Sequence, residues 1–314
     1  MNRTTIGSSA PLLLCSSYIS GMRSLRTLLH RIIDYAGLFP PAGLDMSPAV
    51  AEYARERAGP DRWALGRFVA PAARLDELGR AAAPCLPPAG EPWRVSALVG
   101  ADTTGDLATI VRFNDSHGGR AVADAIELKA ATADVIAAAL DTIGPGFDTY
   151  VELPVHADPA ELIHAVGQLG ARAKIRTGGI TADAFPAPPD LLRFIRACVD
   201  AGVAFKATAG LHHPLCGGYA LTYAAASARA PMYGFLNLFL AAAFMARGLG
   251  DAEGAALLAE QSPAAFRFSD PVVEWRGRSL AEPDLARARR EVATSFGSCS
   301  FREPIDDLRS LGFL

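Results

Sequence analysis

Short β-type runs alternate with longer Ala- and Leu-rich runs of helical periodicity from Gly66 onward. The helical runs span 75–83, 107–114, 133–143, 160–169 and 189–201. The predicted strands begin near Arg67, Val95, Ala125, Tyr150, Ala173, Ala204 and Tyr233, with an eighth near Phe266 or Val272. This alternation is typical of repeated βα units in a parallel sheet. Strand spacings of mostly about 23 to 31 residues predict an α/β fold, a TIM-type (β/α)8 barrel, rather than an open doubly wound sheet.

Further elements are predicted on either side of this repeat. A helix over Leu25–Tyr35 precedes it and runs into a proline-containing turn. The segment Phe266–Arg278 alternates apolar and polar residues, which favours a hairpin over an ideal eighth strand. A helix over Glu282–Ala293 then leads into a turn of small residues, 296–304, whose serines are placed to cap a last helix, 305–310.

Residues 23–314 are therefore expected to form a single (β/α) barrel domain, and residues 1–22 a disordered or mis-started extension. The apolar run within 1–22 is too short for a signal-peptide core. The most apolar helix, Phe235–Ala246, contains Asn237 and is shorter than the ~18 apolar residues of a bilayer span, so no membrane partner is expected. The same helix either packs inside the barrel wall or forms a dimer surface, which leaves homo-oligomerisation open.

The composition narrows the choice of partners. The chain has 30 basic and 33 acidic residues and a pI near 6.1, so it lacks the basic surplus that holds a nucleic-acid backbone. Its five cysteines are scattered without a Cys-x-x-Cys pair, which favours a reducing cytoplasm over a disulfide framework. No Gly-x-Gly-x-x-Gly or Walker-type loop follows the first strand, and no cofactor is expected.

Four of the predicted strands carry ionisable residues at alternating positions, within 125–129, 150–154, 173–177 and 205–208. Side chains of a strand alternate between its two faces, so each of three residue pairs shares a face: Glu127 with Lys129, Lys174 with Arg176, and Lys206 with Thr208. The other face holds apolar residues: Ile126, Leu128, Val151, Leu153, Ile175 and Phe205. Burying unpaired charge is costly, so the charges are expected to compensate one another and to form an active site. The alternative is a set of exposed edge residues.

Two lysines stand late in adjacent predicted strands, in the runs Lys174-Ile-Arg-Thr-Gly and Lys206-Ala-Thr-Ala-Gly. A second ammonium nearby lowers the pKa of a lysine and so favours the nucleophilic amine. The two runs resemble those of the class I (Schiff-base) aldolases of the TIM-barrel superfamily, in particular deoxyribose-phosphate aldolase. The resemblance covers about 40 of the 314 residues. It implies that Lys174 forms an imine and Lys206 tunes it, with the reverse assignment left open.

The sequence departs from that family in three ways. The strand count places the lysines on strands five and six instead of six and seven, Arg176 has no counterpart, and no glycine-rich phosphate loop follows the later strands.

The remaining charged residues suggest proton transfer and substrate binding. Glu127 and Glu152 are candidates for proton transfer, or they merely neutralise Lys129 and Lys174. Arg176 suits a carboxylate or a phosphate, although it could also bridge the two glutamates. Four cations against two anions, with Thr208 as a further contact, predict a small anionic substrate: Lys129, Lys174, Arg176 and Lys206 against Glu127 and Glu152.

His212 and His213 follow a predicted strand, and one of them is expected to face the site while the other packs or faces solvent. With Glu127 and Glu152, one histidine could complete a divalent-metal site. Cys299 either is a thiol activated at a helix N-terminus or belongs to a tight cap.

The preferred hypothesis is a lyase or aldolase-type enzyme that acts on a small anionic carbonyl metabolite through a lysine Schiff base, with no metal. The alternatives are a metal-dependent lyase, isomerase or hydrolase on the same barrel, and a barrel that binds an anionic ligand without catalysis.

Overall fold

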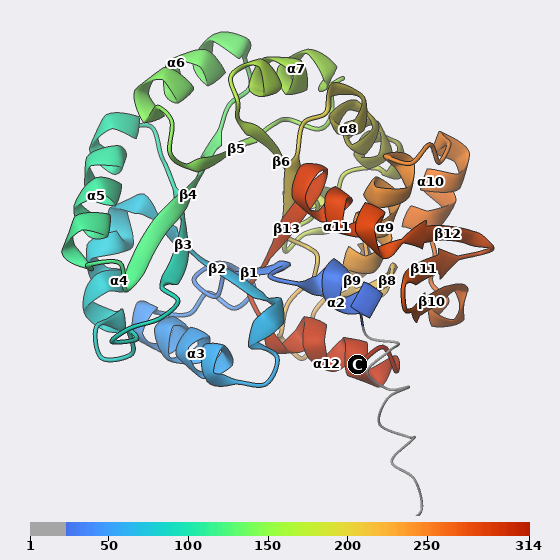
Figure 1. Cartoon of the computed structure of the whole chain (residues 1–314), viewed down its shortest axis with the longest axis horizontal. Coiled ribbons are helices and arrows are strands. Elements are labelled where there is room, and N and C mark those ends of the chain that lie inside the picture. Colours follow the sequence, from blue (N-terminus) through green and yellow to red (C-terminus); the bar gives the residue numbers. More distant parts are fainter. Residues whose placement is uncertain (1–22) are drawn as a thin grey trace, which may run out of the picture.

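Eight parallel strands close into a barrel at the centre of the computed structural model, which describes residues 23–314 (Figure 1). In chain order they are β1 (Ile33–Tyr35), β2 (Leu65–Pro71), β3 (Trp93–Leu98), β4 (Ala121–Lys129), β5 (Asp148–Glu152), β6 (Arg172–Arg176), β7 (Phe205–Thr208) and β13 (Ala293–Ser298). Strand β13 closes the barrel by pairing with β1 and with β7. The predicted TIM-type (β/α)8 barrel is therefore confirmed, while the predicted extension 1–22 lies outside the described residues.

Helices surround the barrel and follow its strands (Figure 1). They are α2 (Arg23–Leu29), α3 (Met46–Ala58), α4 (Leu75–Ala82), α5 (Thr103–Ser116), α6 (Ala133–Ile143), α7 (Ala160–Gln168), α8 (Pro188–Ala201), α9 (Phe235–Met245), α10 (Asp251–Leu258), α11 (Glu282–Glu291) and α12 (Arg302–Ser310). Local sequence sets several of their ends: α8 begins with two prolines and stops at Gly202 in the left-handed conformation. Ser300 caps α12 by accepting a hydrogen bond from the Glu303 amide at 3.1 Å, as the sequence predicts.

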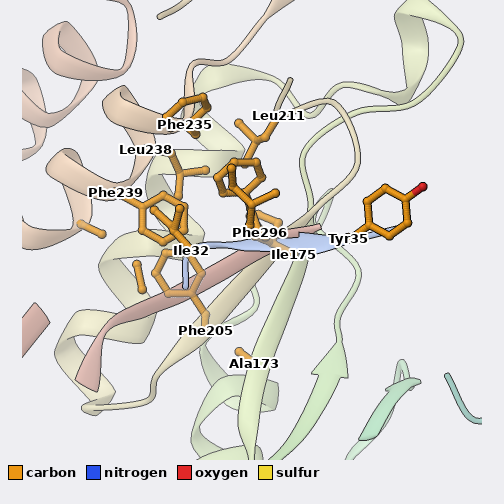
Figure 2. Close-up of a cluster of buried hydrophobic side chains, with 14 of the residues drawn as sticks. Ile32, Tyr35, Ala173, Ile175, Phe205, Leu211, Phe235, Leu238, Phe239 and Phe296 are labelled. Atoms are coloured by element: carbon orange, nitrogen blue, oxygen red, sulfur yellow. The ribbon is translucent and has the colours of Figure 1, made fainter. Parts of the chain in front are cut away.

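Helix α9 packs against the outer face of the barrel. Figure 2 shows Phe235, Leu238 and Phe239 of this helix gathered beside Phe296 of β13 and Phe205 of β7. The rings of Phe235 and Phe296 stack with their centroids 5.0 Å apart. Every residue of α9 is buried, so of the two predicted alternatives this helix forms part of the barrel wall.

No helix within residues 23–314 has the length and apolarity that crossing a membrane requires.

The predictions for the two closing strands of the barrel were wrong. The predicted helix 25–35 ends at Leu29, because Arg31 takes a positive φ of 48° and the chain re-emerges as strand β1. The first residues of the predicted turn 296–304 belong to strand β13. Ala293, predicted as the last residue of helix 282–293, is the first residue of the same strand.

The strands predicted near Tyr233 and Phe266 lie outside the barrel. Residues Arg229–Met232 form β9, which pairs with β8 (Gly217–Ala220) in a separate two-stranded sheet. The hairpin predicted over 266–278 is confirmed as β10 (Phe266–Ser269) and β11 (Val272–Trp275), to which β12 (Arg278–Ala281) adds a third strand. With β1 counted, the lysine-bearing strands β6 and β7 are the sixth and seventh of the barrel.

The predicted division of each strand into a charged and an apolar face is confirmed. The apolar residues Ile126, Val151, Ile175 and Phe205 belong to the continuous core between barrel and helices. On the inner face, the side chains buried in the barrel are those of Glu127, Glu152, Lys174 and Lys206. The alternative that these charged residues are exposed at the edge of the sheet holds only for Lys129 and Arg176, which reach solvent at the mouth of the barrel.

Candidate active site

A cavity of about 490 Å³ opens at the carboxyl ends of the barrel strands, where barrel enzymes place their active sites. Its walls combine charged, small and apolar residues: Ala36, Phe39, Pro40, Val69, Leu98, Glu127, Lys129, Glu152, Lys174, Arg176, Gly179, Ile180, Thr181, Ala184, Lys206, Thr208, Ala209, His212, Gly297 and Cys299. Of the nine site residues predicted from the sequence, all except His213 line this cavity.

Lys206 forms the base of the cavity and is enclosed by two carboxylates. Its Nζ donates hydrogen bonds to Asp34 Oδ2 at 2.6 Å and to Glu127 Oε1 at 2.7 Å. The ring of Tyr150 lies beneath the ammonium, with its centroid 5.3 Å from Nζ. Lys206 is therefore held as a cation on three sides.

Lys174 lies next to Lys206, because the two residues are register partners on β6 and β7. Its Nζ is 2.7 Å from Glu127 Oε2 and 2.9 Å from Glu152 Oε2. Glu127 thus bridges the two lysines. Together the side chains form a charge ladder, five groups of alternating sign in the order Asp34, Lys206, Glu127, Lys174 and Glu152.

Asp34, the first member of the ladder, was not predicted as a site residue. It lies on β1, where its Oδ1 accepts the amide of Arg67 at 2.8 Å and its Oδ2 accepts the hydroxyl of Ser295 at 2.8 Å. The residue before Arg67 must be glycine, since a Cβ at Gly66 would come within 2.4 Å of Asp34 Oδ1. The signal in the sequence was an aspartate between buried apolar residues, Ile32-Ile33-Asp34-Tyr35.

Two cations at the mouth contact the outer end of the ladder. Lys129 Nζ and Arg176 Nε each lie 3.4 Å from Glu152 Oε1. Their side chains are 72% and 45% exposed, so both are available to an incoming ligand. The Arg176 bridge between two glutamates is not observed, because Arg176 pairs with Glu152 alone.

Burial and charge shift the pKa values of the ladder. Burial by itself would raise the pKa of Glu127, but the ammonium groups of Lys174 and Lys206 outweigh it and lower that pKa strongly. The pKa of Glu152 is lowered in the same way, chiefly by Lys174. For Lys206, burial favours the neutral amine, yet Asp34 and Glu127 raise its pKa above the ordinary value. The sequence-based expectation that a neighbouring ammonium lowers the pKa of the lysine therefore does not hold for Lys206.

The two histidines have different environments, as predicted. His212 lines the cavity with its Nδ1 3.2 Å from Glu303 Oε2, whereas His213 stacks on Tyr219 at a centroid distance of 3.6 Å and pairs with Asp307. The alternative arrangement, a metal site of Glu127, Glu152 and a histidine, is not seen among the described residues. Within residues 23–314 no three His, Cys, Asp or Glu side chains are grouped as metal ligands, and both glutamates are paired with lysine.

Cys299 belongs to a second polar group at the rim of the cavity. The Tyr223 hydroxyl lies 3.4 Å from Cys299 Sγ and 3.0 Å from Glu303 Oε2. Cys299 lies between β13 and α12, next to Ser300, whose hydroxyl caps α12, so of the two predicted alternatives its position fits the run that forms a tight cap. Glu303 and Tyr223 were missed because nothing in their local sequence connects them to His212.

No family model matches the chain, and no curated protein matches it either.

The use of lysine in this chain is confined to the cavity. Of the 30 basic side chains only three are lysines, Lys129, Lys174 and Lys206, and all three line it. Buried ion pairs elsewhere use arginine, for example Arg67, which contacts Asp124 at 2.7 Å and Asp148 at 2.6 Å. A guanidinium serves structural pairing well, whereas only lysine offers a primary amine that can lose its proton and react.

Proposed function

We propose that this protein is an enzyme that cleaves or forms a carbon–carbon bond in a small anionic carbonyl compound through an imine on Lys174. The observation that carries the proposal is the confinement of all three lysines of the chain to one cavity, two of them buried at its base. The placement of these two lysines on the sixth and seventh barrel strands also removes one departure from the class I aldolase pattern that they resemble.

Lys174 is the better candidate for the nucleophile. Lys206 donates hydrogen bonds to two carboxylates, and its raised pKa favours the unreactive ammonium. Lys174 lies at the open side of the charge ladder, with its Nζ 2.9 Å from Glu152 Oε2. Glu152 is therefore placed to accept the Lys174 proton.

The proposed reaction proceeds in balanced steps. Lys174 gives a proton to Glu152, the free amine adds to the carbonyl carbon, and the carbonyl oxygen leaves as water after taking two protons. Cleavage then transfers the electron pair of the carbon–carbon bond to the protonated imine as a substrate hydroxyl loses its proton. The resulting enamine is protonated on carbon, and water hydrolyses the imine to regenerate Lys174.

The charge ladder suits this intermediate because the ammonium and the protonated imine of Lys174 carry the same charge. Glu127 and Glu152 already flank that position, so they stabilise the iminium without rearrangement. Lys206 contributes by keeping Glu127 ionised.

Reductive trapping tests the proposal. The protein is incubated with small aldehydes and 2-oxo acids plus borohydride, and adducts are located by intact mass and peptide mapping among the three lysines and the N-terminal amine. We expect an adduct on Lys174 that Lys174→Arg abolishes while Lys129→Arg and Lys206→Arg retain it. Arginine preserves the positive charge of the ladder, and a thermal melt checks that each variant folds. Absence of an adduct with every carbonyl compound, or its persistence in Lys174→Arg, would overturn the proposal.

A further inference from the structure

Glu152 connects the mouth cations to the proposed nucleophile. Its Oε1 lies 3.4 Å from both Lys129 Nζ and Arg176 Nε, longer than the 2.7–2.9 Å typical of a charge-assisted hydrogen bond. Its Oε2 lies 2.9 Å from Lys174 Nζ. The two mouth cations are thus loosely held by a carboxylate that also contacts Lys174.

The charge ladder and the two mouth cations together carry an excess of one positive charge. Four cations, Lys129, Lys174, Arg176 and Lys206, face three anions, because Asp34 joins Glu127 and Glu152 in the charge ladder. The difference, four minus three, is one. His212 does not alter it, since Glu303 lies 3.2 Å away as its counter-charge. A ligand with a single negative charge therefore neutralises the cavity, whereas a phosphate dianion exceeds it.

Part of the cavity lining is apolar. Phe39 and Pro40 from the loop after β1, Val69 of β2, Leu98 of β3 and Ile180 after β6 line the same cavity. These side chains offer no hydrogen bonds to sugar hydroxyls but would bury a hydrocarbon or aromatic group. A ligand that fits both the charged and the apolar part of the lining has an anionic end and an apolar body.

We infer that the substrate is a 2-oxo monocarboxylic acid with an apolar body, whose carboxylate replaces Glu152 on Arg176 and Lys129. This inference rests on the proposed function for the identity of the reacting carbonyl. One carboxylate group, that of Glu152, reaches both Arg176 and Lys174, so a substrate carboxylate on Arg176 places its adjacent carbonyl carbon at Lys174.

The replacement also activates the nucleophile. Lys174, Arg176 and Lys129 together hold the pKa of Glu152 down against the opposing effect of burial. Once the substrate occupies Arg176 and Lys129, Glu152 loses two of its three cations and becomes a stronger proton acceptor for Lys174. Substrate binding is thereby coupled to formation of the reactive amine.

Binding of ligands that lack a carbonyl tests the substrate class apart from the chemistry. Calorimetry compares 3-phenylpropanoate, its neutral amide and 2-phenylethyl phosphate on the full chain. We expect the amide and the phosphate ester to bind at least tenfold more weakly than the carboxylate. Arg176→Gln is expected to weaken carboxylate binding at least tenfold. The control Arg112→Gln, on α5 outside the cavity, leaves it unchanged. Preference for the phosphate ester or the amide, or equal binding by both variants, would overturn the inference.

Trapping rates separate failure of this inference from failure of the proposed function. A 2-oxo acid with an apolar side chain is expected to be trapped on Lys174 at least tenfold faster than its 2-oxo amide. If the carboxylate binds but no carbonyl compound gives an adduct, the imine mechanism is refuted, and with it the requirement for a 2-oxo group in the substrate. The preference of the cavity for an apolar monocarboxylate would still stand. An adduct formed faster with neutral or phosphorylated carbonyl compounds would keep the imine and refute the substrate class.

Discussion

His212 is a buried imidazole whose neighbours favour its charged form. Burial by itself would lower its pKa, but the interactions with Cys299 and Glu303 outweigh this effect and raise the pKa to about 9 from 6.5. A pKa that is higher in the folded state than in the unfolded chain stabilises the fold below pH 6.5. That contribution is lost as the pH rises through about 9.

We therefore predict that the free energy of unfolding falls by up to about 3 kcal/mol between pH 6.5 and 9, since one pKa unit corresponds to about 1.4 kcal/mol. Urea unfolding across this range measures the loss, and NMR titration of the ring reports the pKa directly. His212→Gln should flatten the slope, whereas His156→Gln, at an exposed position, should not. An unchanged slope in His212→Gln would assign the titration to another group.

The sequence predicted those cavity residues that are recognisable from the neighbouring residues of their own strand. Glu127, Lys174 and Lys206 alternate with apolar residues along their own strands, and that pattern holds wherever the strands pair. Asp34 and Glu303 reach the site only because distant segments close the barrel. Strand β1 has three residues, too few to show alternation, so its apolar neighbours mark Asp34 as a buried carboxylate but do not reveal that its partner is Lys206.

Helix α9 is fixed in the barrel wall by one polar side chain. Asn237 is fully buried, and its Oδ1 accepts the Cys216 amide at 2.8 Å. Its Nδ2 donates to the carbonyls of Leu257 and Glu260, each at 2.8 Å. One side chain thus joins the loop after β7 and the end of α10 to the most apolar helix of the chain.

We predict that Asn237→Leu destabilises the fold by about 3 kcal/mol or more. The change leaves the Cys216 amide and the Glu260 carbonyl without a partner, at about 1–3 kcal/mol each, whereas the Leu257 carbonyl keeps the Glu260 amide. Asn114→Leu on α5 is the matched variant, because Asn114 also makes two hydrogen bonds to the backbone of Ala123 but is only half-buried. Urea denaturation of both variants should show the smaller loss for Asn114→Leu. Equal losses would mean that burial does not set the cost.

The elements most open to misassignment were those with the least distinctive composition. Strand β13, Ala293-Thr-Ser-Phe-Gly-Ser298, is rich in small polar residues that suit a turn equally well. It is a strand because β1 and β7 supply hydrogen-bond partners on both sides. Conversely, the β-type residues at 266–275 form a separate antiparallel sheet, since barrel positions one and eight are already occupied.

The whole barrel holds two ionic networks, one at each end of its interior. The charge ladder lies at the carboxyl ends of the strands. At the opposite end Arg67 joins Asp124 to Asp148, and Asp148 also contacts Arg172 at 2.5 Å. The ring of Tyr150 lies between the networks, 5.3 Å from Lys206 Nζ and 5.5 Å from the Arg172 guanidinium carbon. The two networks are thus linked by Tyr150 and by the Arg67 amide, which donates to Asp34 of the charge ladder.

Both networks depend on ionised carboxylates, which determines how the molecule responds to acid. Burial would raise the pKa values of Glu127, Glu152 and Asp148, but neighbouring lysines lower the first two and Arg172 and Arg67 lower the third. A pKa that is lower in the folded state contributes stability above the unfolded value, near 4, and loses it as the pH falls further. We therefore predict a steep decline of the urea midpoint below about pH 4.5 and little change from pH 5 to 6.5.

Two variants separate the two networks. Asp148→Asn should lower stability at pH 7, because Arg67 and Arg172 lose a counter-charge, and should make the acid decline shallower while leaving imine trapping intact. Glu127→Gln should likewise lower stability at pH 7 and make the acid decline shallower. It should also abolish imine trapping, since both lysines then lose the carboxylate they share. Loss of trapping in Asp148→Asn, at a pH where the variant is folded, would show that the two ends of the barrel are coupled, through Tyr150 or through the contact of Arg67 with Asp34.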